Sequence, residues 1–307
     1  MIYTLTLNPA LDYTVFAEGL TVGAVNRAGG FSISYGGKGI NVSAMLKNLN
    51  VSSVALGFIA GFTGNELEKL LLNEGINFDF IKLKSGITRI NVKIREKSET
   101  DINVQGPCAS ADELNLLYKK LNKLEHGDWL VLSGSIPSGM PSDIYARLSE
   151  FAEKRGARVI IDAVGRALTD SLYTKPFLIK PNREELGDIF GEEISGISDA
   201  FFYAENLKAE GAKNVMITLG GEGSALICEN GERLYCSAAD GAVLNTVGAG
   251  DSAVAGFIAG YSENGCYKNA LKLSAAAGGA TAFSNGIGNA ELVNRLRSSI
   301  SVKEYAQ

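Results

Sequence analysis

From about Ala109 onward, short apolar runs alternate with amphipathic helical segments, and this alternation strongly limits the possible fold. Segment 110–124 opens with a capping-box pair, Ser110 and Glu113, and repeats leucine on one helical face. The apolar runs that such helices follow or separate are WLVLSG, RVIID, FLIKP and NVMITLG. The pattern predicts an α/β fold with a doubly wound, mainly parallel sheet flanked by helices on both faces.

The first hundred residues do not follow this alternation. Between Asp12 and Tyr35 the sequence is strand-like and turn-like, and ITRINVKIRE followed by TDINVQG predicts two antiparallel strands. A helical segment, GGKGINVSAMLKNLN, separates these pieces, so the small sheet that they predict is discontinuous in sequence. We expect a single domain over residues 1–307, with a β-sheet lid formed by about 12–35 and 87–107.

Charge and composition argue against several classes of partner. The chain of 307 residues has a formal net charge of −5, and its Lys and Arg residues form no basic run of the kind that binds nucleic acid. No apolar stretch approaches the roughly 18 residues that span a bilayer. The N-terminal MIYTLTLNP enters strand-like alternation at once, without the features of a signal peptide. We therefore expect a cytoplasmic protein with no nucleic-acid or membrane partner.

Histidine and cysteine offer little for metal chemistry. One His and four Cys without a C-x-x-C pair argue against a zinc site and for reduced thiols. Cys228 and Cys236 flank Asn230-Gly231, a pair typical of two-residue hairpin turns. Such a turn would place Cys228 opposite Arg233 and not opposite Cys236.

The strongest local signal is NTVGAGDSAVAGFIAGY, in which Gly248, Ala249 and Gly250 lead into a predicted helix. Main-chain N–H groups at a helix start, together with the helix dipole, bind phosphate or stabilise negative charge that develops on it. Asp251 would lie beside that site, where a carboxylate could accept the proton of an attacking hydroxyl. The structural alternative for the same residues is a tight turn followed by an acidic residue in the first turn of a helix.

A second glycine-rich loop, Gly36-Gly37-Lys38-Gly39, precedes Asn41 and another predicted helix. It fits neither the Walker pattern nor the dinucleotide fingerprint. Its glycines, its Lys charge and the Asn amide suit the recognition of a sugar. A simple strand-to-helix turn is an equally good explanation of the spacing.

The strand predicted in ITRINVKIRE has two different faces. Apolar and polar residues alternate along it, so its period of 2 gives one apolar and one cationic face. The cationic face could close over a phosphorylated sugar, although a solvated strand surface explains the same pattern. The apolar face must be covered by another surface. The alternating residues are Ile90, Val92 and Ile94 on one face and Arg89, Asn91, Lys93 and Arg95 on the other.

Two further segments follow predicted strands. In KPNREE, Asn182 and Glu185 lie three residues apart, which suits Mg²⁺ held through water and phosphate or, equally, a capped helix. In TLGGEG, residues 218–223, the glycines come at the carboxyl end of a parallel strand, where doubly wound folds admit ligands. Tight-turn glycines explain the second segment too.

The order of these motifs resembles one family over essentially the whole chain. GGKGIN, SGSIP, KPNREE, TLGGEG and NTVGAGD occur in the order found in the ribokinase-like phosphofructokinase B family of carbohydrate kinases. The resemblance implies a ribokinase-like α/β domain with a β lid, and ATP that phosphorylates a sugar hydroxyl with Mg²⁺. It also implies a homodimer formed through the lid, which would cover the apolar strand face.

The resemblance assigns roles to individual positions. It makes Asp251 the catalytic base and makes the N–H groups of the preceding residues the anion hole. It implies that Mg²⁺ is held indirectly, through water and phosphate, by an N-x-x-E motif. The anion-hole positions are Gly248, Ala249 and Gly250, and the motif positions are Asn182 and Glu185. The sugar-side positions are Asp12, Gly37, Lys38, Asn41, Arg89, Ser135 and Asp251, with Lys93 and Asn103 added. The nucleotide-side positions are Lys180, Asn182, Glu185, Thr218, Gly220, Gly221, Gly223, Gly248 and Gly250.

Within the family, MIYTLTLNPALDYTV, TRINVKI and TDIN look most like the branch that phosphorylates fructose 1-phosphate at its 6-hydroxyl. The tagatose 6-phosphate branch is the nearest alternative. Ile102-Asn103 stands where the fructose 6-phosphate branch has an arginine, which argues against that substrate. From other classes, a non-catalytic phosphosugar sensor would be expected to lack Asp251 or the glycines. A nicotinamide oxidoreductase would need the absent G-x-G-x-x-G.

Overall fold

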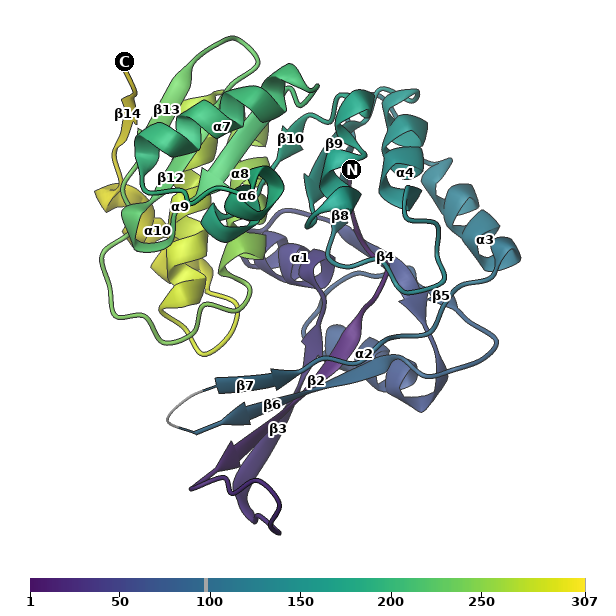
Figure 1. Cartoon of the computed structure of the whole chain (residues 1–307). Coiled ribbons are helices and arrows are strands. Elements are labelled where there is room, and N and C mark those ends of the chain that lie inside the picture. The colour runs from purple at the N-terminus through teal and green to yellow at the C-terminus, as the bar shows by residue number, and fades with distance from the viewer. Residues whose placement is uncertain (97–98, 307) are drawn as a thin grey trace.

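A ten-stranded sheet forms the body of the molecule (Figure 1), in a computed structural model that describes residues 1–96 and 99–306. Its strands are β1 (Ile2–Thr6), β4 (Val54–Ile59), β5 (Ile81–Lys82), β8 (Trp129–Ser133), β9 (Arg158–Asp162), β10 (Leu178–Ile179), β11 (Asn214–Thr218), β12 (Ser224–Ile227), β13 (Arg233–Cys236) and β14 (Val302–Glu304). They lie in the order β14-β13-β12-β11-β10-β9-β8-β1-β4-β5. The strands from β11 to β5 are parallel, and β12 to β14 add an antiparallel edge.

Helices cover both faces of this sheet, as the sequence predicts. In β8, Leu130 and Leu132 pack into one core, whereas Trp129 and Val131 pack into the other. The first core includes side chains of α3 (Ala111–Leu121), α4 (Ile144–Glu153), α5 (Arg166–Thr169), α6 (Arg183–Phe190), α7 (Ile197–Ala209) and the short 3₁₀ turn η1 (Leu172–Thr174). The second includes side chains of α1 (Lys38–Asn48), α8 (Ala249–Asn264), α9 (Tyr267–Ala282) and α10 (Ala290–Ser299). The predicted doubly wound α/β architecture is confirmed.

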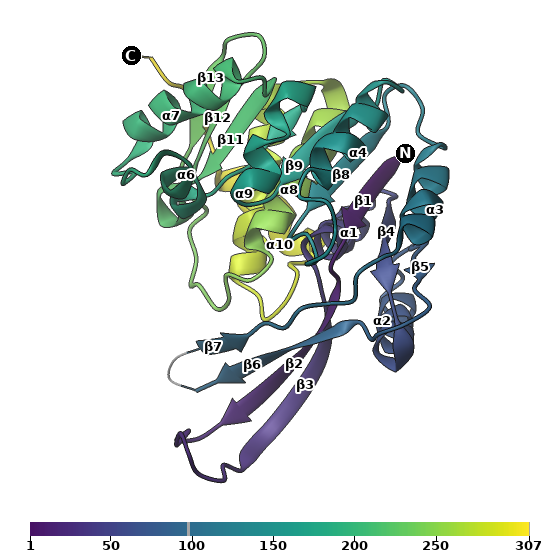
Figure 2. The same ribbon diagram turned by 45° about the vertical axis from the view of Figure 1, so that its right-hand side comes forward.

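A separate four-stranded sheet projects from this body (Figure 2). It has the order β3-β2-β6-β7 and is built from β2 (Ala10–Ala17), β3 (Ala28–Gly36), β6 (Arg89–Arg95) and β7 (Glu99–Ile102). The predicted antiparallel pairing of β6 with β7 is confirmed, and β2 pairs with β6 in parallel. The helices α1 and α2 (Gly61–Asn73) separate the two halves of this sheet in sequence, so it is discontinuous as predicted. Its action as a lid stays a prediction.

The hairpin between β12 and β13 departs from the expected register. Ile227, and not Cys228, pairs with Arg233. The Cys228 N–H donates to the carbonyl oxygen of Glu232, which closes a three-residue turn over 229–231. Gly231 has φ +88°, and the Asn230 side chain accepts from the Glu232 N–H, so the Asn-Gly pair forms a longer turn than the two-residue type. All four cysteines are free thiols.

Within the described residues, no helix combines the length and the apolar character that a membrane crossing requires.

Small residues line the contact between helices α8 and α9 and let the two helices approach closely. A Cβ atom on Gly256 would lie 2.5 Å from the main-chain oxygen of Leu273 and 2.9 Å from the Cβ of Ala277. A Cβ on Gly260 would lie 2.9 Å from the Cα of Ala270. The helix pair therefore depends on glycine at these positions.

We expect Gly256→Ala to lower the free energy of unfolding by roughly 1–3 kcal/mol, because the added methyl group meets main-chain atoms that cannot rotate away. Alanine in an exposed helix would instead stabilise by about 1 kcal/mol. Chemical denaturation measures the difference. Gly286→Ala is the control, since no atom lies within 4 Å of a Cβ built there. An increase in the free energy of unfolding for Gly256→Ala would show that α8 and α9 can move apart to accept the methyl group without a cost in stability.

Candidate active site

Asp251 is buried in the first turn of α8, with 5% of its surface exposed. Its Oδ2 accepts a 2.8 Å hydrogen bond from the amide Nδ2 of Asn41 on α1. Gly248 precedes α8 at φ +81°, a conformation that favours glycine, and a Cβ there would lie 2.9 Å from Ile287 Cδ1. The glycine motif therefore fixes where α8 begins and brings Asp251 against α1.

A cluster of charged side chains, of which Asp162 and Lys180 are buried, lies beside Asp251. Asp162, the last residue of β9, places its Oδ1 3.2 Å from Lys38 Nζ and 3.3 Å from Lys180 Nζ. Lys38 begins α1, and Lys180 follows β10 directly. Lys38 Nζ also lies 3.7 Å from Glu185 Oε1 on α6. Two ammonium groups thus lie with the carboxyl groups of Asp162 and Glu185 at the carboxyl edge of the parallel sheet.

The cluster changes the protonation of its members. Burial raises the pKa of Asp251 to about 6, and the negative charge of Asp162 adds to that rise, against opposing effects from Lys38, the Asn41 hydrogen bond and Lys180. Burial alone would raise the pKa of Asp162, but Lys180 and Lys38 hold it below its usual value. Burial alone would lower the pKa of Lys38, but the surrounding carboxylates raise it. Asp251 is therefore the group whose charge changes near neutral pH.

The start of α8 can receive an anion. The first N–H groups of a helix have no acceptor within it. The N–H of Ala249 is engaged by the carbonyl oxygen of Thr246 at 3.2 Å. A Cβ on Gly250 would lie 3.2 Å from Lys180 Nζ, so the ammonium group covers this part of the main chain closely. Gly250 is therefore the predicted anion-hole position for which close contact with a cation is observed.

The glycines of the GGKG loop have a packing role as well. A Cβ on Gly37, which has φ +129°, would lie 2.8 Å from Thr6 Cγ2. A Cβ on Gly39 would lie 2.7 Å from Thr6 Oγ1 and 3.0 Å from the main-chain oxygen of Leu5. These glycines let α1 start directly against β1. Strand-to-helix packing and the placement of Lys38 and Asn41 at one site are therefore compatible explanations of the same loop.

In the small sheet, Asp12 is the centre of a second polar cluster. Its Oδ2 lies 2.9 Å from Lys93 Nζ, and its Oδ1 accepts a 2.9 Å hydrogen bond from Asn91 Nδ2. Gly36 leaves room for this carboxylate, because a Cβ there would lie 2.6 Å from Asp12 Oδ1. All three polar side chains are buried. Part of the predicted cationic face is thus neutralised within the protein.

Arg89 and Ser135 lie near a residue that the sequence reasoning did not single out, Asn8. The Asn8 amide donates to Ser135 Oγ at 3.3 Å, and its main-chain oxygen accepts from Arg89 Nε at 3.2 Å. Asn103 is exposed beyond β7, and among the residues described it has no hydrogen bond or ion pair with the other candidates. The structure therefore groups Arg89 with Ser135 and leaves Asn103 apart.

The predicted nucleotide-side residues surround the start of α6 and the end of β11. Asn182 and Glu185 form a capping box, in which each side chain accepts from the other residue's N–H at 2.8 and 2.9 Å. Asn182 also pairs with Thr218 in a parallel bridge. The glycines follow in the 3₁₀ turn η2 (Gly220–Glu222) and just after it. Gly220 and Gly221 have open space where a Cβ would stand, whereas a Cβ on Gly223 would collide with the main-chain oxygen of Cys236.

Two residues of these clusters, Asp162 and Asn8, escaped the sequence reasoning. Asp162 ends the apolar run RVIID, and an acidic residue at the carboxyl end of a parallel strand is a usable signal. Asn8 follows β1 in a short connection and carries no comparable signal. Its contacts with Ser135 and Arg89 depend on how the two sheets lie relative to each other, which the local sequence does not show.

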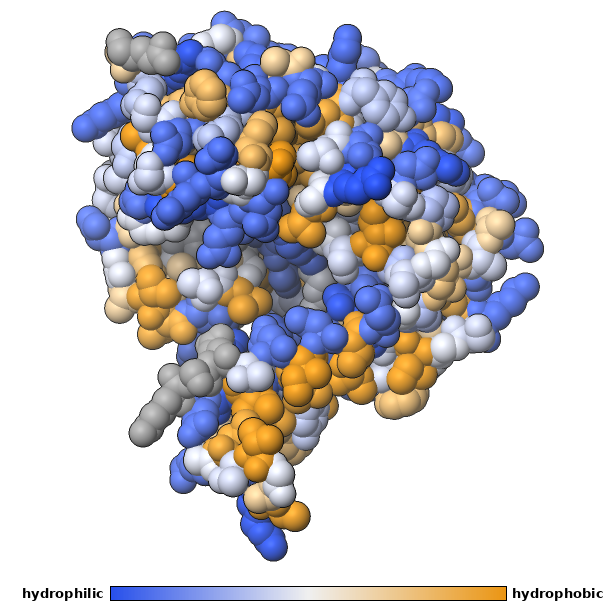
Figure 3. All heavy atoms as spheres, viewed as in Figure 1, coloured by the Kyte–Doolittle hydropathy of each residue, from blue (hydrophilic) through white to orange (hydrophobic). Residues whose placement is uncertain are grey.

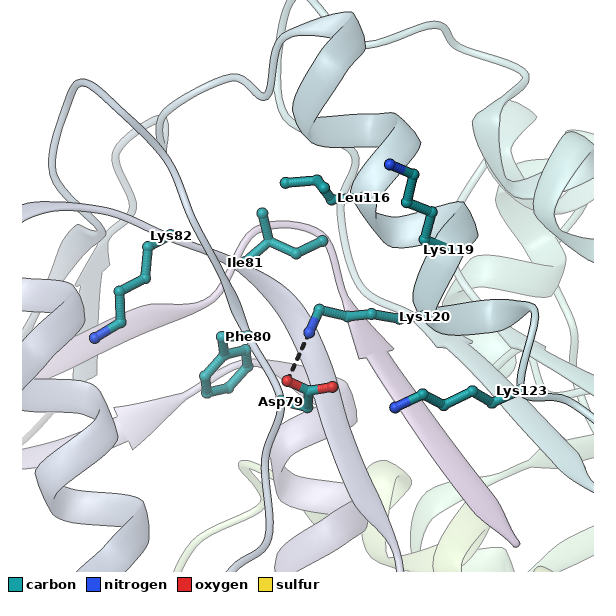
Figure 4. A pocket seen from close by; sticks show the side chains of 8 residues that line it. All are labelled: Asp79, Phe80, Ile81, Lys82, Leu116, Lys119, Lys120 and Lys123. Atoms are coloured by element: carbon teal, nitrogen blue, oxygen red, sulfur yellow. Dashed lines mark hydrogen bonds and ion pairs between the residues drawn. The ribbon is translucent and has the colours of Figure 1, made fainter.

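A pocket of about 450 Å³ lies elsewhere, between β5 and α3 (Figure 4). Lysines surround its apolar floor, and Lys120 forms a 2.6 Å ion pair with Asp79. None of the candidate site residues lines it, and β5 is the outermost strand of the sheet. This pocket is separate from the Asp251 cluster. Its lining residues are Asp79, Phe80, Ile81, Lys82, Leu116, Lys119, Lys120 and Lys123.

Known proteins resemble this chain in sequence and in fold. Residues 5–293 match the family model described as pfkB family carbohydrate kinase. A 1-phosphofructokinase of Bacillus subtilis (strain 168) is 43% identical over 302 residues, 98% of this chain and 99% of that protein. A D-tagatose-1-phosphate kinase of Bacillus licheniformis is 38% identical over 304 residues, 98% of this chain and 99% of that protein. The crystal structure of phosphofructokinase-2 from Escherichia coli in complex with fructose-6-phosphate has a TM-score of 0.90 at 27% identity, covering 97% of this chain and 98% of that chain.

We expect Asn41→Ala to raise the pKa of Asp251 above its value of about 6, because the variant removes a hydrogen bond that favours the ionised carboxylate. A carboxyl-carbon NMR titration measures the shift. Asn48→Ala on the same helix is the control, since its amide bonds to the Gly288 carbonyl and not to Asp251. An unchanged or lower pKa in Asn41→Ala would contradict the assigned hydrogen bond.

Proposed function

The chain belongs to the pfkB family of carbohydrate kinases, and we propose that it transfers the γ-phosphoryl group of ATP to the 6-hydroxyl of fructose 1-phosphate. The products would be fructose 1,6-bisphosphate and ADP. The likeness to the Bacillus subtilis 1-phosphofructokinase over almost the full length of both chains supports this substrate. The family resemblance read from the motif order is confirmed.

The observation that carries the proposal is the buried Asp251 beside two lysines at the start of α8. In the proposed reaction, Asp251 takes the proton of the 6-hydroxyl as that oxygen attacks the γ-phosphorus in line. The N–H groups of the first turn of α8, Lys38 and Lys180 would meet the negative charge that spreads over the phosphoryl oxygens. A pKa of about 6 leaves Asp251 mostly ionised at neutral pH, as a base must be.

A kinase of this family uses a nucleotide with a divalent metal, and we propose ATP with Mg²⁺. Among the described residues, no group of three or more His, Cys, Asp or Glu side chains could hold a metal alone. The oxygens near the cluster fit a metal held through water and phosphate. Glu185 Oε1 takes no part in the capping box, and Asp162 Oδ2 is buried with no hydrogen-bond partner in the part of the chain that the structure describes. The bound metal would neutralise phosphate charge.

We propose that the sugar phosphate binds between the two sheets. Asp12, held by Lys93 and Asn91, would accept hydroxyl hydrogen bonds, and Arg89 with Ser135 would contact the phosphate end. The small sheet would act as a lid that excludes water, so that bound ATP is not hydrolysed. Because Asp12 balances the charge of Lys93, we assign Lys93 to the orientation of Asp12. Gly37, Lys38 and Asn41 complete the proposed sugar side, and Asn103 stays the weakest member.

The proposed nucleotide side lies around α6 and η2. Asn182, Glu185 and Thr218 are adjacent, and the open space at Gly220 and Gly221 leaves their main chain accessible to a ligand. Lys180 would reach the phosphates, since it lies beside Gly250. Gly223 supports the turn through its close approach to β13. Gly248 supports the helix start by its left-handed conformation.

The rival ketose suggested by the relatives is tagatose 1-phosphate, which differs from fructose 1-phosphate in configuration at one carbon. Both carry the phosphate at carbon 1 and a free hydroxyl at carbon 6. A non-catalytic sensor remains the alternative from another class, and the presence of Asp251 and of the three residues before it counts against it.

The first test compares kcat/KM for fructose 1-phosphate, fructose 6-phosphate, tagatose 1-phosphate and tagatose 6-phosphate with MgATP, by ADP release. We expect a clear preference for fructose 1-phosphate, because this ratio reports how well the enzyme distinguishes transition states. A preference for either tagatose phosphate would keep the kinase and change its substrate. An absence of turnover with all four would favour the sensor.

The control for this assay is Asp251→Asn, which has the same shape but accepts no proton. Loss of a general base lowers kcat by about 10²–10⁴-fold, whereas ATP binding measured by calorimetry should persist. Activity of the wild type should fall as the pH drops below about 6, where Asp251 becomes protonated. Near-wild-type kcat in Asp251→Asn would remove the base assignment.

We propose a homodimer formed through the small sheet. Apolar side chains gather on one face of that sheet (Figure 3), and Phe31, Ile33 and Ile102 on it are exposed. The strand pairings place these residues on the same face as Ile90, Val92 and Ile94. An exposed apolar surface of this kind is typical of a subunit contact.

We expect the wild type to be a dimer in light scattering and Phe31→Asp to shift it toward the monomer, because a charge would be buried in the contact. Phe202→Asp is the matched control, since Phe202 on α7 is 61% exposed and Phe31 is 63% exposed. A monomeric wild type, or equal dissociation of both variants, would refute a contact through the small sheet.

A further inference from the structure

Asn8 lies in the short connection, residues 7–9, that leads from β1 of the main sheet into β2 of the small sheet. The residue is only 5% exposed although it belongs to a loop. Loops usually run over the surface, because buried main-chain and side-chain polar groups need partners. The buried amide of Asn8 therefore needs hydrogen-bond partners within the protein.

The contacts of Asn8 come from both sheets. Its amide Nδ2 donates to Oγ of Ser135, which follows β8 of the main sheet, at 3.3 Å. Its main-chain oxygen accepts from Nε of Arg89, the first residue of β6 in the small sheet, at 3.2 Å. The Arg89 guanidinium also donates to the main-chain oxygen of Val104 at 3.3 Å. Asn8 thus touches one polar group from each side of the proposed sugar-phosphate site.

The other side-chain atom of Asn8 is unusual. Its Oδ1 is buried and has no hydrogen-bond partner among the residues described. Gly106 packs against it so closely that a Cβ at that position would collide with Oδ1. Buried acceptors without a donor are rare and costly in native proteins. The protein tolerates this acceptor where segments of both sheets meet.

We propose that Asn8 is a positioning residue that sets the spacing between Ser135 and Arg89 for the sugar phosphate. The inference rests on the proposed function. A guanidinium has five N–H donors, and among the described residues only Asn8 and Val104 accept hydrogen bonds from it, so the other donors can serve phosphate oxygens. Because Ser135 and Arg89 belong to different sheets, their spacing depends on the connection between the sheets. Asn8 contacts both residues and acts through them, without binding the substrate itself.

The test is the steady-state kinetics of Asn8→Ala in the full chain. Loss of the amide releases Ser135 and loosens the connection, so we expect the KM for fructose 1-phosphate to rise by roughly tenfold while the KM for MgATP stays at the wild-type value. In a double-mutant cycle with Ser135→Ala, the two losses in kcat/KM should be less than additive, because both variants remove the same contact.

Asn214→Ala is the matched control. Asn214 is fully buried at the start of β11, its amide donates to the Phe177 carbonyl at 2.7 Å, and its oxygen accepts from the Glu229 N–H at 2.8 Å. None of these three residues is a candidate site residue. We expect this variant to lower the melting temperature and leave both KM values unchanged. If Asn8→Ala behaves in the same way, Asn8 is a structural residue and the proposal is overturned.

A second variant covers the case in which Asn8→Ala does not fold. Asn8→Asp has nearly the same shape, loses the amide donor and places a negative charge near the phosphate, so the KM for fructose 1-phosphate should rise here as well. A wild-type KM in Asn8→Asp overturns the proposal. If the wild type phosphorylates none of the sugar phosphates, the proposed function fails; an active wild type with unaffected Asn8 variants means that only the positioning role fails.

Discussion

The buried carboxylate of Asp162 binds two ammonium groups, and the geometry of the site depends on that pairing. Its Oδ1 lies 3.2 Å from Lys38 Nζ and 3.3 Å from Lys180 Nζ, and these side chains come from the ends of β9 and β10 and the start of α1. Because a buried charge without a partner is costly, each of these side chains fixes the others. The cluster therefore keeps two positive charges beside Asp251 and Gly250, where the proposed phosphoryl transfer develops negative charge.

Small residues let α8 bring Asp251 into this cluster. Gly248 takes the left-handed conformation that starts the helix, and Gly250 leaves room for Lys180. Farther along, Gly256 and Gly260 let α8 approach α9 closely enough for main-chain atoms to touch. The position of the Asp251 carboxylate thus depends on glycines at the start of α8 and on glycines farther along the helix.

Local sequence patterns predicted the main sheet, its helices and the discontinuous small sheet, because apolar periodicity and caps act over a few residues. They did not predict Asp162 or Asn8, whose partners Lys38 and Ser135 lie 124 and 127 residues away. The sequence of β6 predicts a cationic strand face but does not show that part of its charge is neutralised. That neutralisation comes from the pairing of β2 with β6, which places Asp12 within reach of Lys93. The position of the Asn230-Gly231 turn was predicted correctly. The register of the two strands was not, because the turn contains three residues and not two.

The way in which the two sheets are joined links the proposed lid to the proposed chemistry. Residues 7–9 connect β1 to β2, and Gly37 alone separates β3 from Lys38 at the start of α1. A rotation of the small sheet would therefore act first on Asn8 and on Lys38, which hold Ser135 and Asp162. The charge of Lys93 is already balanced by Asp12, so in the small sheet Arg89 is the better candidate to meet a phosphate. Closure would then bring Arg89 toward the main sheet through the same short connections that position Lys38 beside Asp251.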